Sequence, residues 1–128
     1  MIFELWYYNA TLPNSGGIKR RPVLIIGDDG ENGLSIVDIH YCLVSATSQK
    51  GNFDVIIDET TAQSLGLSRE SIIKTTKMYT GTRNNLGGKI ADLPELLKKE
   101  FRAKYKEYQE KIINGLAPSS LSDSDAEE

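Results

Sequence analysis

The sequence predicts a mainly β fold with some helix: a small β-barrel of bent antiparallel strands with a C-terminal amphipathic helix. Two observations lead to this prediction. Several short segments rich in β-branched and aromatic residues are separated by runs of Gly, Pro, Asn and Asp, which favour turns. After them comes one segment, from Leu93 to Ile112, in which apolar residues recur at helical spacing.

The first half of the chain alternates between strand-like and loop-like segments. Proline contributes no backbone N–H, so Pro22 suits only the first position of the apolar run that it opens. Further on, alternate apolar residues share one face, as in a strand; they are Val37, Ile39, Tyr41 and Leu43. The predicted elements are a strand over Phe3–Asn9, a loop over Ala10–Arg20, a strand over Pro22–Ile26, a turn over Gly27–Gly33 and a strand over Leu34–Ala46.

The second half of the chain contains two predicted helices. Asp58 is a suitable N-cap and Gly66 a suitable stop for one or two helical turns. Asp92 and Pro94 suit the start of the last helix, and Gly115 suits its end. The predicted elements are a loop over Thr47–Asn52, a strand over Phe53–Ile57, a helix over Glu59–Leu65, a strand over Ser71–Tyr79, a loop over Thr80–Gly88, a strand over Lys89–Ala91, and the long helix with its stripe of Leu93, Leu97, Phe101, Tyr105, Tyr108 and Ile112.

Charge and length bound the class of protein. The chain has 128 residues and a formal net charge of −3. Its C-terminal segment, Pro118–Glu128, is rich in Ser and acidic residues and has no basic one, which is typical of a disordered tail. We therefore expect one domain over residues 1–117 and an acidic tail over residues 118–128. The domain alone is near neutral, which argues against strong non-specific DNA binding.

The scarcity of His and Cys excludes several kinds of site. Cys42 and His40 are the only residues of their types, which argues against a disulfide framework and the usual zinc sites. We expect Cys42 to be a small packed residue and His40 an ordinary hydrogen-bonded one. No apolar stretch approaches the about 20 residues that span a bilayer, and the N-terminus does not have a signal-peptide pattern. We expect a cytoplasmic protein with no membrane segment and no cofactor or metal.

The candidate functional residues lie where one predicted strand begins and another ends. A Gly-containing loop ends in the basic run Lys19–Arg21, and the long strand ends in the polar run Ser45–Gly51. In an antiparallel hairpin, Arg21 and Thr47 can be neighbours at one rim of the sheet. A guanidinium holds two phosphate oxygens at once, and a hydroxyl adds a further hydrogen bond. On spacing alone, an ordinary surface arginine and an ordinary turn threonine are the favoured interpretation.

The same segments resemble the MazF/PemK family of toxin endoribonucleases from bacterial toxin–antitoxin systems. That family has a Gly-containing loop, a basic residue, Arg-Pro and an apolar strand, which correspond here to Gly16–Ile26. A Thr/Ser-rich strand end follows, and then a strand with a Phe-acidic-aliphatic pattern, here Ala46–Gly51 and Phe53–Ile57. The resemblance covers roughly Phe3 to Phe101.

The resemblance implies an SH3-like barrel of the CcdB and PemK type. It also implies the toxin of a type II toxin–antitoxin system, a homodimer that cleaves single-stranded RNA, including mRNA, without a metal and that a cognate antitoxin neutralises. Arg21 and Thr47 correspond to the catalytic pair of the family, and the 2′-hydroxyl of the RNA is the nucleophile. The residues expected to bind RNA are Asn14, Lys19, Arg20, Ser48, Gln49, Lys50 and Arg83.

Two other interpretations stay open at this point. The first is a toxin resembling CcdB, which has the same barrel fold and acts by jamming gyrase. Such toxins depend on a C-terminal Trp-Gly-Ile end. The one tryptophan of this sequence is Trp6, which favours the nuclease. The third interpretation is a non-catalytic relative that binds RNA or an antitoxin, and the presence of Arg21 and Thr47 argues against it.

Overall fold

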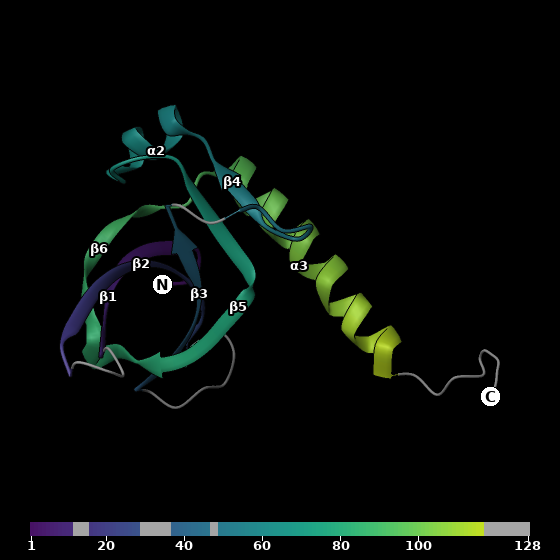
Figure 1. Ribbon diagram of the computed structural model, residues 1–128, viewed down its shortest axis with the longest axis horizontal. Coiled ribbons are helices and arrows are strands. Elements are labelled where there is room, and N and C mark those ends of the chain that lie inside the picture. The colour runs from purple at the N-terminus through teal and green to yellow at the C-terminus, as the bar shows by residue number, and fades with distance from the viewer. Residues whose placement is uncertain (12–15, 29–36, 47–48, 117–128) are drawn as a thin grey trace.

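The computed structural model describes residues 1–11, 16–28, 37–46 and 49–116. In these ranges, six strands form one sheet with the order β4-β5-β3-β2-β1-β6, and every neighbouring pair is antiparallel. The sheet curls into a barrel-like ring, and helix α3 lies outside it (Figure 1). The mainly β barrel with a C-terminal helix is confirmed. The elements are β1 (Glu4–Thr11), β2 (Ile18–Gly27), β3 (Asp38–Ser45), β4 (Val55–Ile57), α2 (Glu59–Leu65), β5 (Ser71–Thr82), the 3-10 turn η1 (Arg83–Asn85), β6 (Leu86–Asp92) and α3 (Glu95–Leu116).

The short helix α2 has the predicted bounds and the predicted caps. The Asp58 carboxylate accepts a hydrogen bond from the backbone N–H of Thr61 at 2.8 Å, which satisfies one of the first-turn amides. Gly66 ends the helix with a φ of 94°, a conformation that glycine adopts without a steric penalty. Local signals therefore set both ends of this helix.

Strand β2 begins earlier than the sequence predicts. It starts at Ile18, so the end of the predicted loop Ala10–Arg20 belongs to a strand, and Pro22 lies inside β2 opposite Tyr7 of β1. Pairing of β2 with β3 starts only at Val23, so the first part of β2 has β1 as its neighbour. A proline is tolerated in that part because no second strand requires its missing N–H.

The predicted polar loop over Thr80–Gly88 is wrong. Strand β5 continues to Thr82 by pairing with the start of β3, and β6 begins at Leu86 by pairing with Tyr8. The turn η1, of three residues, is all that separates these strands. The polar composition of this segment is typical of a loop. However, strands distant in the sequence form hydrogen bonds with its backbone, and this pairing outweighs the preference of its residues for a loop.

Strand β3 is buried on both faces. Ile39 and Tyr41 lie on one face and Cys42 and Val44 on the other, all with exposed fractions below a tenth. Val37, expected to share the first face, lies before the strand and is 51% exposed. The first part of the predicted strand over Leu34–Ala46 and most of the predicted turn over Gly27–Gly33 lie outside the described residues, as do residues 117–128, the region of the expected tail.

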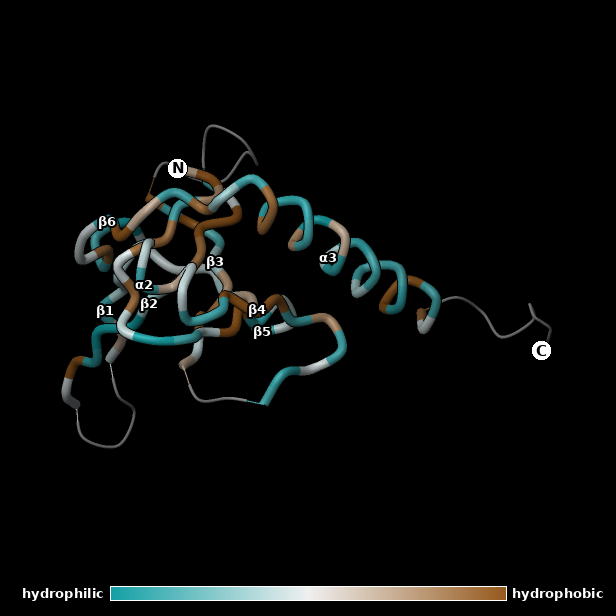
Figure 2. The backbone as a smooth tube through the Cα atoms, turned by 90° about the horizontal axis from the view of Figure 1, so that it is seen from above, coloured by the Kyte–Doolittle hydropathy of each residue, from teal (hydrophilic) through white to brown (hydrophobic). Residues whose placement is uncertain are grey.

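Two apolar clusters hold the molecule together. The first joins the sheet to α2 and to the start of α3 through Leu97 and Phe101. The second consists of strand residues alone and includes Tyr8 and Tyr41. Helix α3 starts against the barrel and projects beyond it (Figure 2). Accordingly, its last residue, Leu116, is 80% exposed. In the described ranges, no helix has the length and apolar character needed to span a membrane.

Candidate nucleic-acid interface

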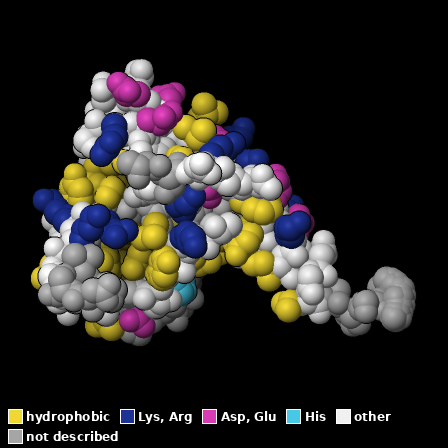
Figure 3. Space-filling model, in the orientation of Figure 1, with side chains coloured by type: hydrophobic (Ala, Val, Ile, Leu, Met, Phe, Trp, Pro, Cys, Tyr) yellow, Lys and Arg dark blue, Asp and Glu magenta, His cyan; other side chains and the backbone are white. Residues whose placement is uncertain are grey.

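A cleft of about 480 Å³ opens where β2 begins and β3 ends. Six of its twelve lining residues are Lys or Arg, and none of this lining is acidic. The same excess of dark blue basic side chains is visible around the middle of the barrel face (Figure 3). A cleft walled by charge of one sign focuses its field and attracts polyanions. The lining residues are Lys19, Arg20, Arg21, Pro22, Leu43, Val44, Ser45, Ala46, Arg69, Lys74, Lys77 and Tyr79.

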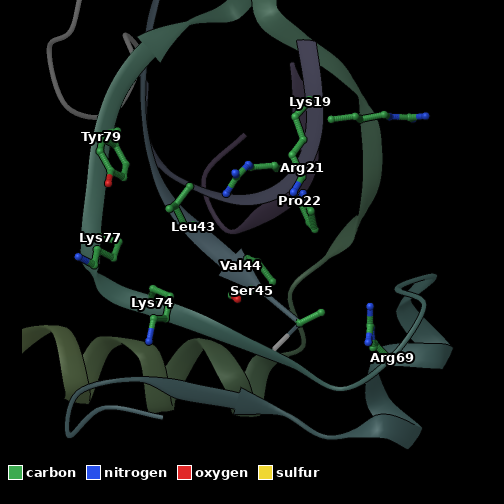
Figure 4. Close-up of a pocket in the computed structure, with 12 residues that line it drawn as sticks. Lys19, Arg21, Pro22, Leu43, Val44, Ser45, Arg69, Lys74, Lys77 and Tyr79 are labelled. Atoms are coloured by element: carbon green, nitrogen blue, oxygen red, sulfur yellow. The ribbon is translucent and has the colours of Figure 1, made fainter. Parts of the chain in front are cut away.

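Arg21 and Tyr79 define the two sides of this cleft. Arg21 extends from β2 and Tyr79 from β5, and the two side chains point toward one another across the space that the sheet encloses (Figure 4). Arg21 is exposed, and none of the described carboxylates forms an ion pair with it. Its guanidinium is therefore available to an anion that enters the cleft.

The antiparallel pairing of β2 with β3 places the two predicted strand ends at one rim. Val23 lies opposite Leu43, and two residues further out this register brings Arg21 level with Ser45. Both residues line the cleft. Thr47 follows Ser45 by two positions in the chain. It lies outside the described residues, as do Ser48 and Asn14.

The neighbouring basic residues of β2 are not equivalent to Arg21. Successive strand residues point to opposite faces, so Arg20 faces away from Arg21. The Arg20 guanidinium lies 3.8 Å from the centre of the Tyr7 ring, a cation–π contact that holds it against β1. Lys19 shares the face of Arg21, and both Lys19 and Arg20 contribute to the cleft lining.

Two cleft lysines come from an irregular part of β5. Cys42 of β3 lies opposite Met78, but the next residue, Leu43, lies opposite Lys74, so residues 75–77 bulge out of the ladder. In a regular strand, Lys74 and Lys77 would point to opposite faces; with the bulge, both line the cleft. Sequence analysis missed these two lysines because a bulge has no local sequence signal. It also missed Arg69, Ser45 and Tyr79, which reach the cleft from other elements or other parts of β5.

An ion pair between buried Asp54 and partly buried Lys74 supports the segment that follows Thr47 and Ser48. Lys74 Nζ lies 2.9 Å from Asp54 Oδ2 and also donates to the backbone oxygen of Gln49 at 3.1 Å. The same Asp54 oxygen accepts the N–H of Gly51 at 2.7 Å. Asp54 is 2% exposed, so these hydrogen bonds compensate a charge that water barely reaches.

The remaining predicted RNA-binding residues lie beside or away from the cleft. Gln49 and Lys50 are exposed and do not belong to the described lining. Arg83 lies in η1, where its Nη1 is 3.2 Å from Met1 Sδ, and it does not line the cleft either. Among the described residues, no group of three or more His, Cys, Asp or Glu is arranged to hold a metal ion.

The fold and the cleft define a small curled β-barrel with a cationic site suited to a nucleic-acid strand. The model of the PemK-like, MazF-like toxins of type II toxin–antitoxin systems matches residues 3–107. The chain belongs to this family, and the resemblance stated from the sequence is confirmed. No curated protein matches the chain at a significant level.

Solved structures share the fold at low sequence identity. The chain is similar to the Mycobacterium tuberculosis toxin MazF-mt6 (18% identity, TM-score 0.63), with 82% of this chain and 96% of the other covered. It is similar to a chain of a MazE–MazF structure from Deinococcus radiodurans (21%, TM-score 0.66; 85% and 94% covered). It is also similar to a chain of a mycobacterial endoribonuclease structure with its cognate antitoxin (12%, TM-score 0.64; 93% and 98% covered).

Proposed function

We propose that this toxin is an endoribonuclease that cleaves single-stranded RNA in the basic cleft. The observation that carries the proposal is the position of Arg21, exposed at the rim and directed into a cleft whose described lining is cationic and has no carboxylate. Such a lining favours the phosphate backbone of a nucleic acid. Family membership supports the choice of RNA, because toxins of this kind are known as endoribonucleases.

In the proposed reaction, the RNA supplies its own nucleophile. The 2′-oxygen attacks the adjacent phosphorus, the bond from phosphorus to the 5′-oxygen breaks, and a 2′,3′-cyclic phosphate is left. One proton leaves the 2′-hydroxyl and one reaches the departing 5′-oxygen. DNA has no 2′-hydroxyl and would be spared.

Arg21 would stabilise the charge that builds on the non-bridging phosphate oxygens. Its guanidinium is always protonated and offers two parallel N–H groups to two oxygens. Thr47 would orient the phosphate, with Ser48 as a second hydroxyl. Because side-chain cations neutralise the phosphate in this scheme, cleavage requires no metal ion. Further contacts to the RNA are proposed for Asn14, Lys19, Arg20, Gln49, Lys50 and Arg83.

We also propose that the toxin works as a homodimer and is neutralised by a cognate antitoxin. Support comes from the similar structures, two of which contain an antitoxin with a chain of this fold. An antitoxin segment with carboxylates would complement the cationic cleft and compete with RNA there.

The test is cleavage of a long single-stranded RNA in EDTA by the purified toxin. Wild-type protein is expected to give discrete fragments with 2′,3′-cyclic phosphate ends, and Arg21→Ala to lose about 100-fold or more of the rate. Arg102→Ala is the matched control, because Arg102 lies on α3 outside the cleft. Absence of cleavage by folded wild-type protein, or full activity of Arg21→Ala, would overturn the proposal.

A further inference from the structure

Three tyrosine rings form a column that ends in the cleft. The ring centres of Tyr8 and Tyr41 are 4.6 Å apart with planes at 31°, and those of Tyr41 and Tyr79 are 5.9 Å apart at 30°. Tyr8 and Tyr41 are buried, whereas Tyr79 is 46% exposed and lines the cleft. The column therefore begins in the second apolar cluster and ends with a ring in contact with solvent.

The buried end of the column is held by specific contacts. The Tyr8 hydroxyl is within hydrogen-bonding distance of the backbone N–H of Thr82 (3.4 Å) and of the Asn85 side-chain amide (3.2 Å). Gly81 leaves the space into which the Tyr8 hydroxyl and the Tyr41 ring fit, since a Cβ at this position would collide with both.

The surroundings of Tyr79 suit a nucleotide. Arg21 faces it across the cleft, and Lys77 precedes it by two residues on β5. An aromatic ring beside cations that hold a backbone is the combination by which proteins bind single-stranded nucleic acid, since every base has a π-face that can stack. A purely structural ring would gain more stability from burial than Tyr79 does.

We propose that Tyr79 is a base-stacking platform, on which the base next to the phosphate held by Arg21 adds a fourth ring to the tyrosine column. The inference rests on the proposed function, because it places a base in the site that acts on RNA. Because a base inside a duplex is already covered on both faces, stacking on Tyr79 would account for the proposed cleavage of single strands.

Binding of strands that cannot be cleaved tests this separately from catalysis. The probes are a fluorescent 2′-O-methyl RNA octamer, whose blocked 2′-oxygen cannot attack, and an abasic strand of the same length with the same phosphates. Wild-type protein is expected to prefer the strand with bases. Tyr79→Leu should weaken that binding about tenfold and leave abasic binding unchanged, whereas Tyr79→Phe, which keeps the ring, should bind as wild type. Lys77→Gln should weaken binding of both strands by the same factor.

Each outcome decides the inference. Equal affinity of Tyr79→Leu and wild type for the strand with bases would overturn it, as would equal losses on both strands. Failure of wild-type protein to bind either strand would overturn both proposals. If wild-type protein binds with the expected Tyr79 dependence but does not cleave unmodified RNA, the stacking site stands and the proposed nuclease fails.

Discussion

Asp54, which is buried, forms an ion pair with the partly buried Lys74 at the junction of β4 and β5, and their atoms Oδ2 and Nζ are 2.9 Å apart. Through it, the Lys74 ammonium is held on the backbone oxygen of Gln49, just after the positions of Thr47 and Ser48. The pair therefore connects the core of the barrel to the segment that bears the proposed catalytic hydroxyl.

Asp54→Asn is expected to lower the free energy of unfolding by roughly 2 to 3 kcal/mol, because Lys74 would keep a largely buried charge without its counter-ion. Urea unfolding followed by circular dichroism measures this. Glu95→Gln is the control, since the pair of Glu95 with Lys98 is exposed and its loss should leave stability nearly unchanged. An equal effect of both substitutions would show that the Asp54–Lys74 pair has no special structural role.

Binding of the 2′-O-methyl octamer is expected to weaken as salt rises, because each neutralised phosphate releases counter-ions. Lys77→Gln should reduce the slope of log K against log salt by about 0.7, the contribution of one phosphate contact on a single strand. Lys99→Gln, on the exposed side of α3, should leave the slope unchanged. Anisotropy titrations between low and moderate salt give both slopes, and an unaltered slope in Lys77→Gln would remove Lys77 from the phosphate contacts.

Gly81→Ala is expected to destabilise the protein by about 1 to 3 kcal/mol, because the added methyl group meets the Tyr8 hydroxyl and the Tyr41 ring. Thermal unfolding measures the change. Gly115→Ala is the matched control: nothing lies within 4 Å of a Cβ there, and alanine is the better helix former. A melting temperature of Gly81→Ala equal to that of wild type would mean that the tyrosine column is not tightly packed.

Cys42 is expected to resist alkylation in the folded protein. It is fully buried, and burial together with the nearby Asp54 charge raises the pKa of its thiol to about 12. Iodoacetamide should therefore react slowly with the folded protein at pH 8, where little of the thiol is ionised, and rapidly once urea is added. Mass spectrometry of the labelled protein follows both rates.

The same pKa shift has a consequence for stability. The thiol ionises near its ordinary pKa in the unfolded chain but only near 12 in the folded one, so folding stability is lost as pH rises through that window. Cys42→Ala should make the decline between pH 8 and pH 11 shallower. If the decline is equally steep in Cys42→Ala, the loss of stability comes from other groups. One such group is the Tyr41 phenol, because burial also raises its pKa.

Much of the fold is encoded over short distances in the sequence. The caps Asp58 and Gly66 define α2 to the residue, and the apolar spacing along α3 identifies the face that Leu97 and Phe101 bury. The Arg-Pro step at Arg21 and Pro22 also lies at the rim of the cleft, as its sequence pattern predicts. These signals act within about one helical turn or one strand end, which is why a single sequence carries them.

Strand pairing and the rest of the cleft depend on tertiary structure. Whether Thr80–Gly88 is loop or strand is decided by β3 and β1, which lie far away in the chain and satisfy its backbone hydrogen bonds. The bulge of β5 that brings Lys77 to the side of Lys74, and the curl that sets Tyr79 facing Arg21, arise in the same way. The family, the two helices and the proposed role of Arg21 can therefore be predicted from the sequence, because their signals are local. The places of Lys74, Lys77 and Tyr79 in the cleft depend on the folded sheet, because strand register and sheet curvature arise only when the strands pair.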